Sequence, residues 1–138
     1  MHTFARLLTI AALCLALPAA AAAQGNGPTP RIAPGTYRVV PDSNFSAGMD
    51  VSAFTMRFEG DSIMVIEQSG SMVTRSRTSY EGGHLVWTDL EGALACPGVA
   101  KYALTLTEEG KRVRLSPVED GCPERSAIVA QVSLVRME

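Results

Sequence analysis

Residues 54–80 read FTMRFEGDSIMVIEQSGSMVTRSRTSY, and this stretch decides the fold. Three runs rich in β-branched, aromatic and apolar residues are separated by two tight turns, EGD at 59–61 and QSGS at 68–71. Glycine in each turn supplies the positive φ that a short hairpin connection needs. Connections this short join neighbouring antiparallel strands, so the stretch predicts a three-stranded meander.

The same pattern extends in both directions along the chain. Two further glycine turns, EGG at 81–83 and EEG at 108–110, separate short β-rich runs. The predicted strands cover residues 36–40, 54–59, 62–68, 72–80, 85–89, 99–107, 112–117 and 128–135. No window of a dozen residues keeps a helical stripe, although 120–126 is long enough for one helical turn. The prediction is an all-β, eight-stranded antiparallel up-and-down barrel, since closure removes both exposed sheet edges.

The N-terminal 23 residues have the pattern of an export signal. One arginine precedes an apolar run over 7–17, followed by Pro18 and Ala21-Ala22-Ala23. These are the three parts of a secretory signal, with cleavage expected near Ala23. The apolar run is shorter than the roughly 20 residues that span a bilayer, and bulky Leu13 before Cys14 argues against a lipoprotein site. We therefore predict a signal peptide at 1–23, a disordered leader at 24–34 and a barrel domain at 35–138, with a periplasmic or secreted location and no stable membrane anchor after cleavage.

Removal of the signal leaves two cysteines, Cys96 and Cys122. An even pair in an exported protein is most often a disulfide. The alternatives, a redox pair or a metal site, would need a C-x-x-C spacing or neighbouring histidine ligands, which are missing here. The sequence predicts one structural disulfide.

Charge and motifs narrow the class of protein. The whole chain has 14 acidic and 12 basic residues, and the part after the signal keeps all 14 acids and 11 of the bases, a net charge of −3. This composition argues against a nucleic-acid binder. His84 is the one histidine after the signal, and no metalloprotease, nucleophile-elbow or phosphate-loop motif occurs. No catalytic residue, metal ligand or cofactor is predicted, and the protein is expected not to be an enzyme.

Strand alternation predicts which side chains face inward. In the run 72–80, Arg75 and Arg77 should face solvent, which leaves Thr74, Ser76, Thr78 and Tyr80 inside. A dry core rarely keeps such a row of hydroxyls without partners. The carboxylates Asp89, Glu91, Asp120 and Glu124 lie near the cysteines in the predicted barrel, where a salt bridge with Arg125 is expected rather than acid–base chemistry.

Several short motifs in order carry a family resemblance. They are GTY at 35–37, FEGD at 58–61, LVWTD at 85–89 with Gly92, Cys96-Pro97, Tyr102, and VEDGC at 118–122 followed by Arg125. In this order they resemble the calycins, specifically the small lipocalin-like barrels of exported bacterial proteins. The resemblance implies an eight-stranded barrel with a ligand cavity. Tyr37 stands where lipocalins have a tryptophan that packs against a basic residue.

Two interpretations of the interior stay open. Inward residues could line a pocket for a small hydrophobic molecule, or they could simply fill a narrow barrel. The candidate ligand-binding residues are Phe54, Met56, Phe58, Thr78, Tyr80, Trp87, Tyr102 and Leu104. In the long connection 41–53, Phe45 and Met49 could form a lid or could pack on the rim. The first interpretation predicts a ligand-binding protein, and the alternative predicts an envelope or secreted interaction protein that acts through its loops on a protein partner.

Overall fold

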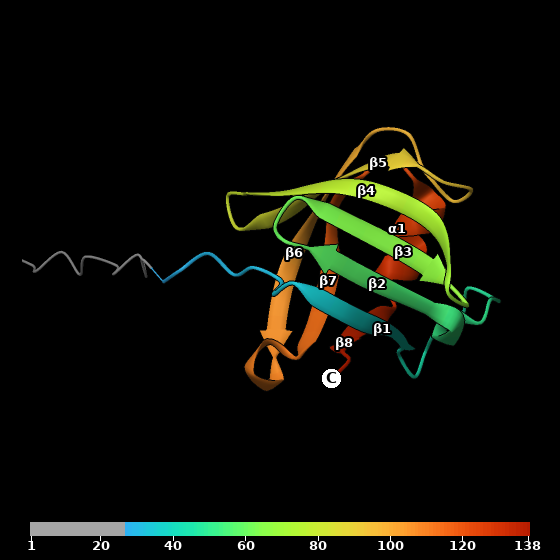
Figure 1. Cartoon of the computed structure of the whole chain (residues 1–138), viewed down its shortest axis with the longest axis horizontal. Helices are drawn as coiled ribbons and strands as arrows, with labels where there is room; N and C mark the ends of the chain where they lie inside the picture. The colour runs from blue at the N-terminus through green and yellow to red at the C-terminus, as the bar shows by residue number, and fades with distance from the viewer. Residues whose placement is uncertain (1–26) are drawn as a thin grey trace, which may run out of the picture.

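A computed structural model describes residues 27–138 and shows a closed barrel of eight antiparallel strands (Figure 1). Every strand pairs with its neighbours in sequence, and β1 closes the barrel by pairing with β8. The predicted fold class and meander topology are confirmed. The strands are β1 Gly35–Pro41, β2 Phe54–Glu59, β3 Ile63–Gln68, β4 Ser71–Glu81, β5 His84–Glu91, β6 Val99–Thr107, β7 Arg112–Asp120 and β8 Val132–Arg136.

The barrel has two ends that differ in their connections. The α1 end carries the connections 42–53, 69–70, 92–98 and 121–131, including the 3-10 turn η1 Val51–Ala53 and the helix α1 Pro123–Val129. The far end carries the tight turns 60–62 and 82–83 and the segment 108–111, which contains η2 Glu108–Gly110. The three long connections and the helix therefore lie at the α1 end, together with the short β3–β4 turn, and the far end has short connections only.

The segment just before β1 packs against the barrel. Residues 1–26, and with them the predicted signal peptide, lie outside the described residues. Ile32 is 1% exposed, its N–H donates to the Tyr80 hydroxyl over 3.2 Å, and the Tyr37 hydroxyl donates to the Ala33 carbonyl over 2.8 Å. Apolar Ile32 therefore covers the far end of the barrel.

The prediction of a strand over 128–135 is wrong at its start. Residues 123–129 form α1, and β8 begins only at Val132. Pro123 favours a helical first turn, and the Ser126 N–H then donates to the Cys122 carbonyl over 3.0 Å. Apolar alternation over 128–134 resembles a strand, but Val129 is buried by α1 lying against the barrel opening. No helix within residues 27–138 has the length and apolar character that a membrane crossing requires.

The inward hydroxyl row of β4 is confirmed. Thr74, Ser76 and Thr78 are between 0% and 4% exposed, while Arg75 and Arg77 face solvent. The hydroxyls of Ser76 and Thr78 have protein partners: Ser76 donates to Asp89 and Thr78 donates to the Asp61 carbonyl over 3.0 Å. These two hydroxyls are therefore compatible with a buried position.

Contacts between β1 and β8 and a bond between the two cysteines close the fold. The Arg136 guanidinium lies 5.9 Å from the centre of the Tyr37 ring and donates to the Pro34 carbonyl. A Cβ on Gly35 would lie 3.1 Å from that guanidinium, so glycine leaves room for it. Cys96 and Cys122 form the predicted disulfide, with their Cα atoms 6.1 Å apart.

Candidate functional site: an apolar cavity at the α1 end

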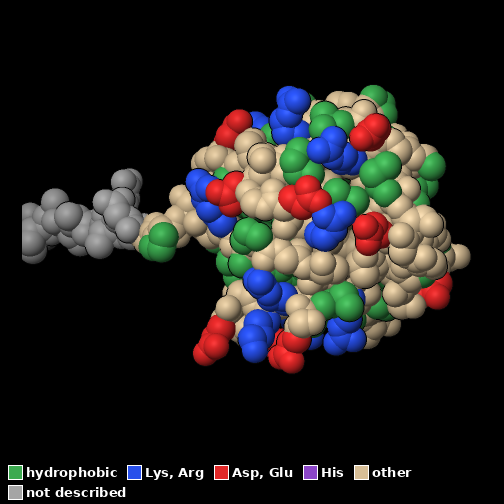
Figure 2. Space-filling model, viewed as in Figure 1, with side chains coloured by type: hydrophobic (Ala, Val, Ile, Leu, Met, Phe, Trp, Pro, Cys, Tyr) green, Lys and Arg blue, Asp and Glu red, His purple; other side chains and the backbone are tan. Residues whose placement is uncertain are grey.

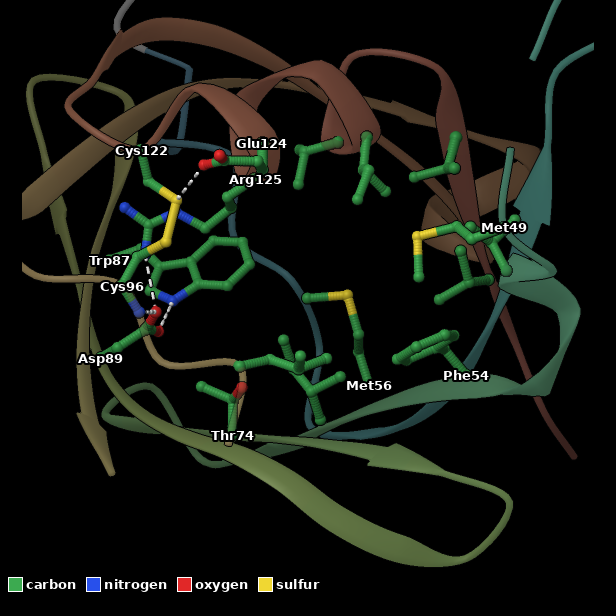
Figure 3. A pocket seen from close by; sticks show the side chains of 17 residues that line it. Met49, Phe54, Met56, Thr74, Trp87, Asp89, Cys96, Cys122, Glu124 and Arg125 are labelled. Atoms are coloured by element: carbon green, nitrogen blue, oxygen red, sulfur yellow. Dashed lines mark hydrogen bonds and ion pairs between the residues drawn. A yellow bond between two sulfur atoms is a disulfide. The ribbon is translucent and has the colours of Figure 1, made fainter. Parts of the chain in front are cut away.

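A cavity of about 220 Å³ opens inside the barrel beneath α1. Strands β1 to β5 and β8 contribute its walls, and α1 and the connections 42–53 and 92–98 complete it. Figure 3 shows Trp87 and the disulfide on one side of the cavity, with Phe54 and Met49 on the other. The lining residues are Val39, Met49, Val51, Phe54, Met56, Ile66, Thr74, Trp87, Asp89, Leu94, Cys96, Cys122, Glu124, Arg125, Ile128, Val129 and Val132.

The other half of the barrel is filled by large side chains. The Tyr37 and Phe58 rings pack edge to face with their centres 5.6 Å apart, and Met64 and Leu85 beside them are fully buried. Tyr102 lies next to Trp87, with ring centres 5.6 Å apart, and marks the boundary between the two halves. The far half of the barrel is therefore filled, and the α1 half contains the cavity.

A buried ionic cluster forms the polar edge of the cavity. Arg125 on α1 donates to Asp120 at the end of β7 over 2.7 and 2.9 Å, and to Asp89 at the end of β5 over 2.8 Å. The Arg125, Asp89 and Asp120 side chains are 8%, 1% and 0% exposed. This confirms the expected pairing of Arg125 with two of the four carboxylates. Glu91 instead lies 3.8 Å from Arg75 on the barrel surface, and Glu124 is exposed at the cavity rim.

Asp89 holds three further groups besides Arg125. Its carboxylate accepts hydrogen bonds from the Ser76 hydroxyl over 2.7 Å, from the Trp87 indole N–H over 2.5 Å and from the Cys96 backbone N–H over 2.8 Å. The guanidinium carbon of Arg125 also lies 5.1 Å from the Trp87 ring centre. The cluster thus fixes the orientation of Trp87, which forms one wall of the cavity.

The buried environment shifts the protonation equilibria of the cluster. Burial alone would raise the pKa of Asp120, but hydrogen bonds from Arg125, Tyr102 and the Cys122 N–H outweigh it and lower that pKa. Burial and the bond to Asp120 raise the pKa of the Tyr102 hydroxyl. Burial opposes the charge of Arg125, but its two carboxylates raise its pKa. At neutral pH Arg125 is therefore a cation and Asp120 is an anion.

The connection 42–53 forms the rim of the cavity and is tied to the chain beyond α1. The Ser46 N–H donates to the Gln131 side-chain carbonyl over 3.0 Å, and the Asp42 N–H donates to the Gln131 backbone carbonyl over 2.9 Å. Met49 is 38% exposed and lines the cavity, whereas Phe45 packs against the core without lining it. Of the two residues expected in a lid, only Met49 lies at the cavity.

Three of the eight candidate ligand-binding residues line the cavity, namely Phe54, Met56 and Trp87. The other five do not, because they lie toward the filled half of the barrel or make structural contacts there. These are Phe58, packed on Tyr37; Thr78, bonded to Asp61; Tyr80, bonded to Ile32; Tyr102, bonded to Asp120; and Leu104, packed against the core.

The sequence interpretation missed the contribution of α1 and of the connection 92–98 to the cavity. Ile128 and Val129 are adjacent apolar residues, which an alternating strand would place on opposite faces, and this was the available signal for a helix. Among residues 27–138, no group of histidine, cysteine or carboxylate side chains is arranged to hold a metal ion. Comparison with protein-family models, with curated proteins and with solved structures found no match for this chain.

Proposed function

We propose that this protein is an exported, lipocalin-like binding protein that holds a small apolar molecule in the cavity beneath α1 and catalyses no reaction. The observation that carries the proposal is the cavity itself, an apolar space inside a barrel whose other half is tightly filled. A concave apolar site with a few fixed polar groups is the usual form of a small-molecule site.

The volume of the cavity limits the size of the ligand. At about 220 Å³ it is below the range of roughly 300–1,000 Å³ that is usual for drug-sized ligands. It is larger than an engineered apolar cavity of about 150 Å³ that binds benzene. A ligand with one ring and a short substituent, or a short aliphatic chain, has the matching size.

The state of the polar groups supports a binding role over catalysis. Asp89 and Arg125 converge on the cavity, as a catalytic pair would need to do, but they bond to each other and to structural partners. A general base needs an oxygen that is free to take a proton from the substrate. Both oxygens of Asp89 already accept two hydrogen bonds each.

Two sets of features support the lipocalin-like and exported parts of the proposal. The closed eight-stranded meander and the packing of Arg136 on Tyr37 agree with the lipocalin-like resemblance of the GTY motif. The signal-like pattern at 1–23 and the disulfide agree with an oxidising compartment. Terminal sequencing of the mature protein should find a chain that begins at Gln24.

A titration that follows the fluorescence of Trp87, the single tryptophan of the chain, tests the binding function. Ethylbenzene and phenethyl alcohol should change the emission, because Trp87 lines the cavity, and should raise the midpoint of thermal unfolding. Val129→Phe would fill the cavity and should abolish both effects. Val86→Phe makes the same change on the outer face of β5 and should leave them intact.

Native mass spectrometry of the mature protein from its own envelope would identify the natural ligand class by its retained mass. If the protein is bare and neither probe binds to the wild type, the binding function is refuted. The alternative function, an interaction protein acting through its loops, then gains support from the exposed Met49, Leu90 and Leu94 at the α1 end, which are 38–52% exposed.

A further inference from the structure

The α1 end of the barrel is poor in free cations. Its four connections, all within the described residues, contain the carboxylates Asp42, Asp50 and Glu124, and Arg125 is their only cation. Arg125 is buried in the cluster, and Asp42 is paired with Arg114 of β7 over 2.6 Å. In Figure 2 the blue lysine and arginine side chains lie over the strands, and none lies at the right-hand tip, where Figure 1 places the β3–β4 turn.

The charges that border the cavity add up to a negative value. The three charged lining residues are Asp89, Glu124 and Arg125, a sum of −1, and the buried Asp120 behind them makes it −2. Asp50, which is exposed and follows the lining residue Met49 in the chain, adds a further carboxylate to the connection 42–53. A ligand that enters here meets carboxylates and no unpaired guanidinium.

Arg125 is poorly placed to bind an anionic ligand. Three of its five N–H groups already donate to Asp89 and Asp120, and one face of its guanidinium lies against Trp87. A ligand carboxylate that approached it would come close to two carboxylates in a site of low dielectric. Such contact between like charges costs more free energy than one charge-assisted hydrogen bond provides.

We propose that the cavity selects apolar molecules that carry an amine group and discriminates against carboxylates of the same size. This inference rests on the proposed binding function. The apolar body occupies the space between Phe54 and Trp87, and the ammonium group stays at the rim beside Glu124, where it keeps part of its hydration. The structure thus points away from a carrier of short fatty or aromatic acids.

Isothermal titration calorimetry with three probes that share a phenethyl body tests the selection. At pH 7 phenethylamine is a cation, phenethyl alcohol is neutral and hydrocinnamate is an anion. We expect the affinity to fall in that order. At low salt the association constant of the amine should exceed that of the acid by about tenfold or more, which is the effect of two or three half-exposed charge contacts. Added salt should reduce the ratio, since the rim is exposed to solvent.

A pair of matched variants shows where the selection arises. Glu124→Gln removes one carboxylate at the rim and should reduce the ratio of amine to acid about fivefold, because the two probes respond with opposite sign. Glu81→Gln makes the same change in total charge at the far end of the barrel and should leave the ratio unchanged.

The outcomes separate the two proposals. If the alcohol binds but the acid binds as tightly as the amine, the selection is wrong and the binding function stands. If Glu81→Gln changes the ratio as much as Glu124→Gln does, the selection reflects total charge and the placement at the rim is wrong. If none of the three probes nor ethylbenzene binds, the binding function and the selection both fall.

Discussion

Replacement of Arg125 with methionine removes the cation of the buried cluster and keeps a long apolar side chain in its place. The variant loses three N–H···O contacts of 2.7–2.9 Å and leaves two carboxylates that are 0–1% exposed without their partner. Removal of one member of a buried pair costs about 3–5 kcal/mol. Because Asp89 keeps its hydrogen bonds from Ser76, Trp87 and Cys96, we expect the lower limit, about 3 kcal/mol at pH 7.

The pH dependence of the same variant gives a sharper test. In the wild type the pKa of Asp120 is lowered, so its contribution to stability is present above the unfolded value near 3.9 and is lost as pH falls below it. Without Arg125, the first of the hydrogen bonds that oppose burial is lost, so the pKa of Asp120 rises and the folded state binds a proton that the unfolded state does not. The variant should therefore become more stable as pH falls from 7 to 5, by up to about 1.4 kcal/mol per pH unit.

Urea unfolding measures both effects, because urea is uncharged and leaves ion pairs unscreened. Circular dichroism should follow the transition, since Trp87 contacts Arg125 and its emission changes with the substitution itself. Arg75→Met is the control, because it breaks the exposed pair with Glu91 and should cost at most about 1 kcal/mol. A loss below 1 kcal/mol for Arg125→Met, with no gain in stability on acidification, would show that the cluster is solvated and refute the reasoning.

Three further changes follow from the fold. Alanine at both Cys96 and Cys122 should lower the free energy of unfolding by about 3.5 kcal/mol, which is the chain-entropy value for a loop of about 27 residues. Equal urea midpoints for the variant and the wild type would contradict this prediction. Gly92→Ala places a Cβ in steric conflict with the Val73 carbonyl oxygen and should lower the melting temperature far more than Gly48→Ala, which shares a positive φ but meets nothing within 4 Å. Tyr102→Phe removes the hydrogen bond to buried Asp120 and should cost about 1.5–3 kcal/mol. Burial and Asp120 raise the pKa of Tyr102, so the neutral hydroxyl contributes its full stabilisation below the unfolded pKa near 10, and this contribution is lost as the pH rises further. Tyr102→Phe should therefore lose less stability than the wild type does when the pH is raised above 10.

The sequence predicts the barrel well because its signals are local. Glycine turns mark the hairpins, and alternation in Phe54, Met56 and Phe58 places one face of β2 inside. Alternation does not indicate how far along the barrel axis an inward side chain lies. Successive inward residues of a strand lie about 6.6 Å apart, so Phe54 and Met56 line the cavity while Phe58 reaches the filled half.

The polar edge of the cavity shows a second limit of sequence reasoning. The hydroxyl at Ser76 was visible as an inward polar group, and Asp89 and Arg125 were visible as charges near the cysteines. Their meeting depends on three chain segments that approach only after the barrel closes and α1 docks. Alternation along 128–135 also favoured a longer strand and outweighed Pro123, which is a local signal for a helix start.

The cluster and the disulfide together explain why the cavity stays open. A cavity lined by side chains that are free to relax tends to shrink, and the cost of a cavity depends on how far its walls can collapse. Here Trp87 is held by Asp89, and the start of α1 is held by the disulfide at Cys122 and by the hydrogen bonds of Arg125. Fixed walls mean that a ligand need not order them on binding, which favours affinity. Arg125→Met should therefore weaken the binding of ethylbenzene, a molecule with no polar group, under conditions where the variant remains folded. An unchanged affinity would show that packing around Phe54 and Met56 alone keeps the site open.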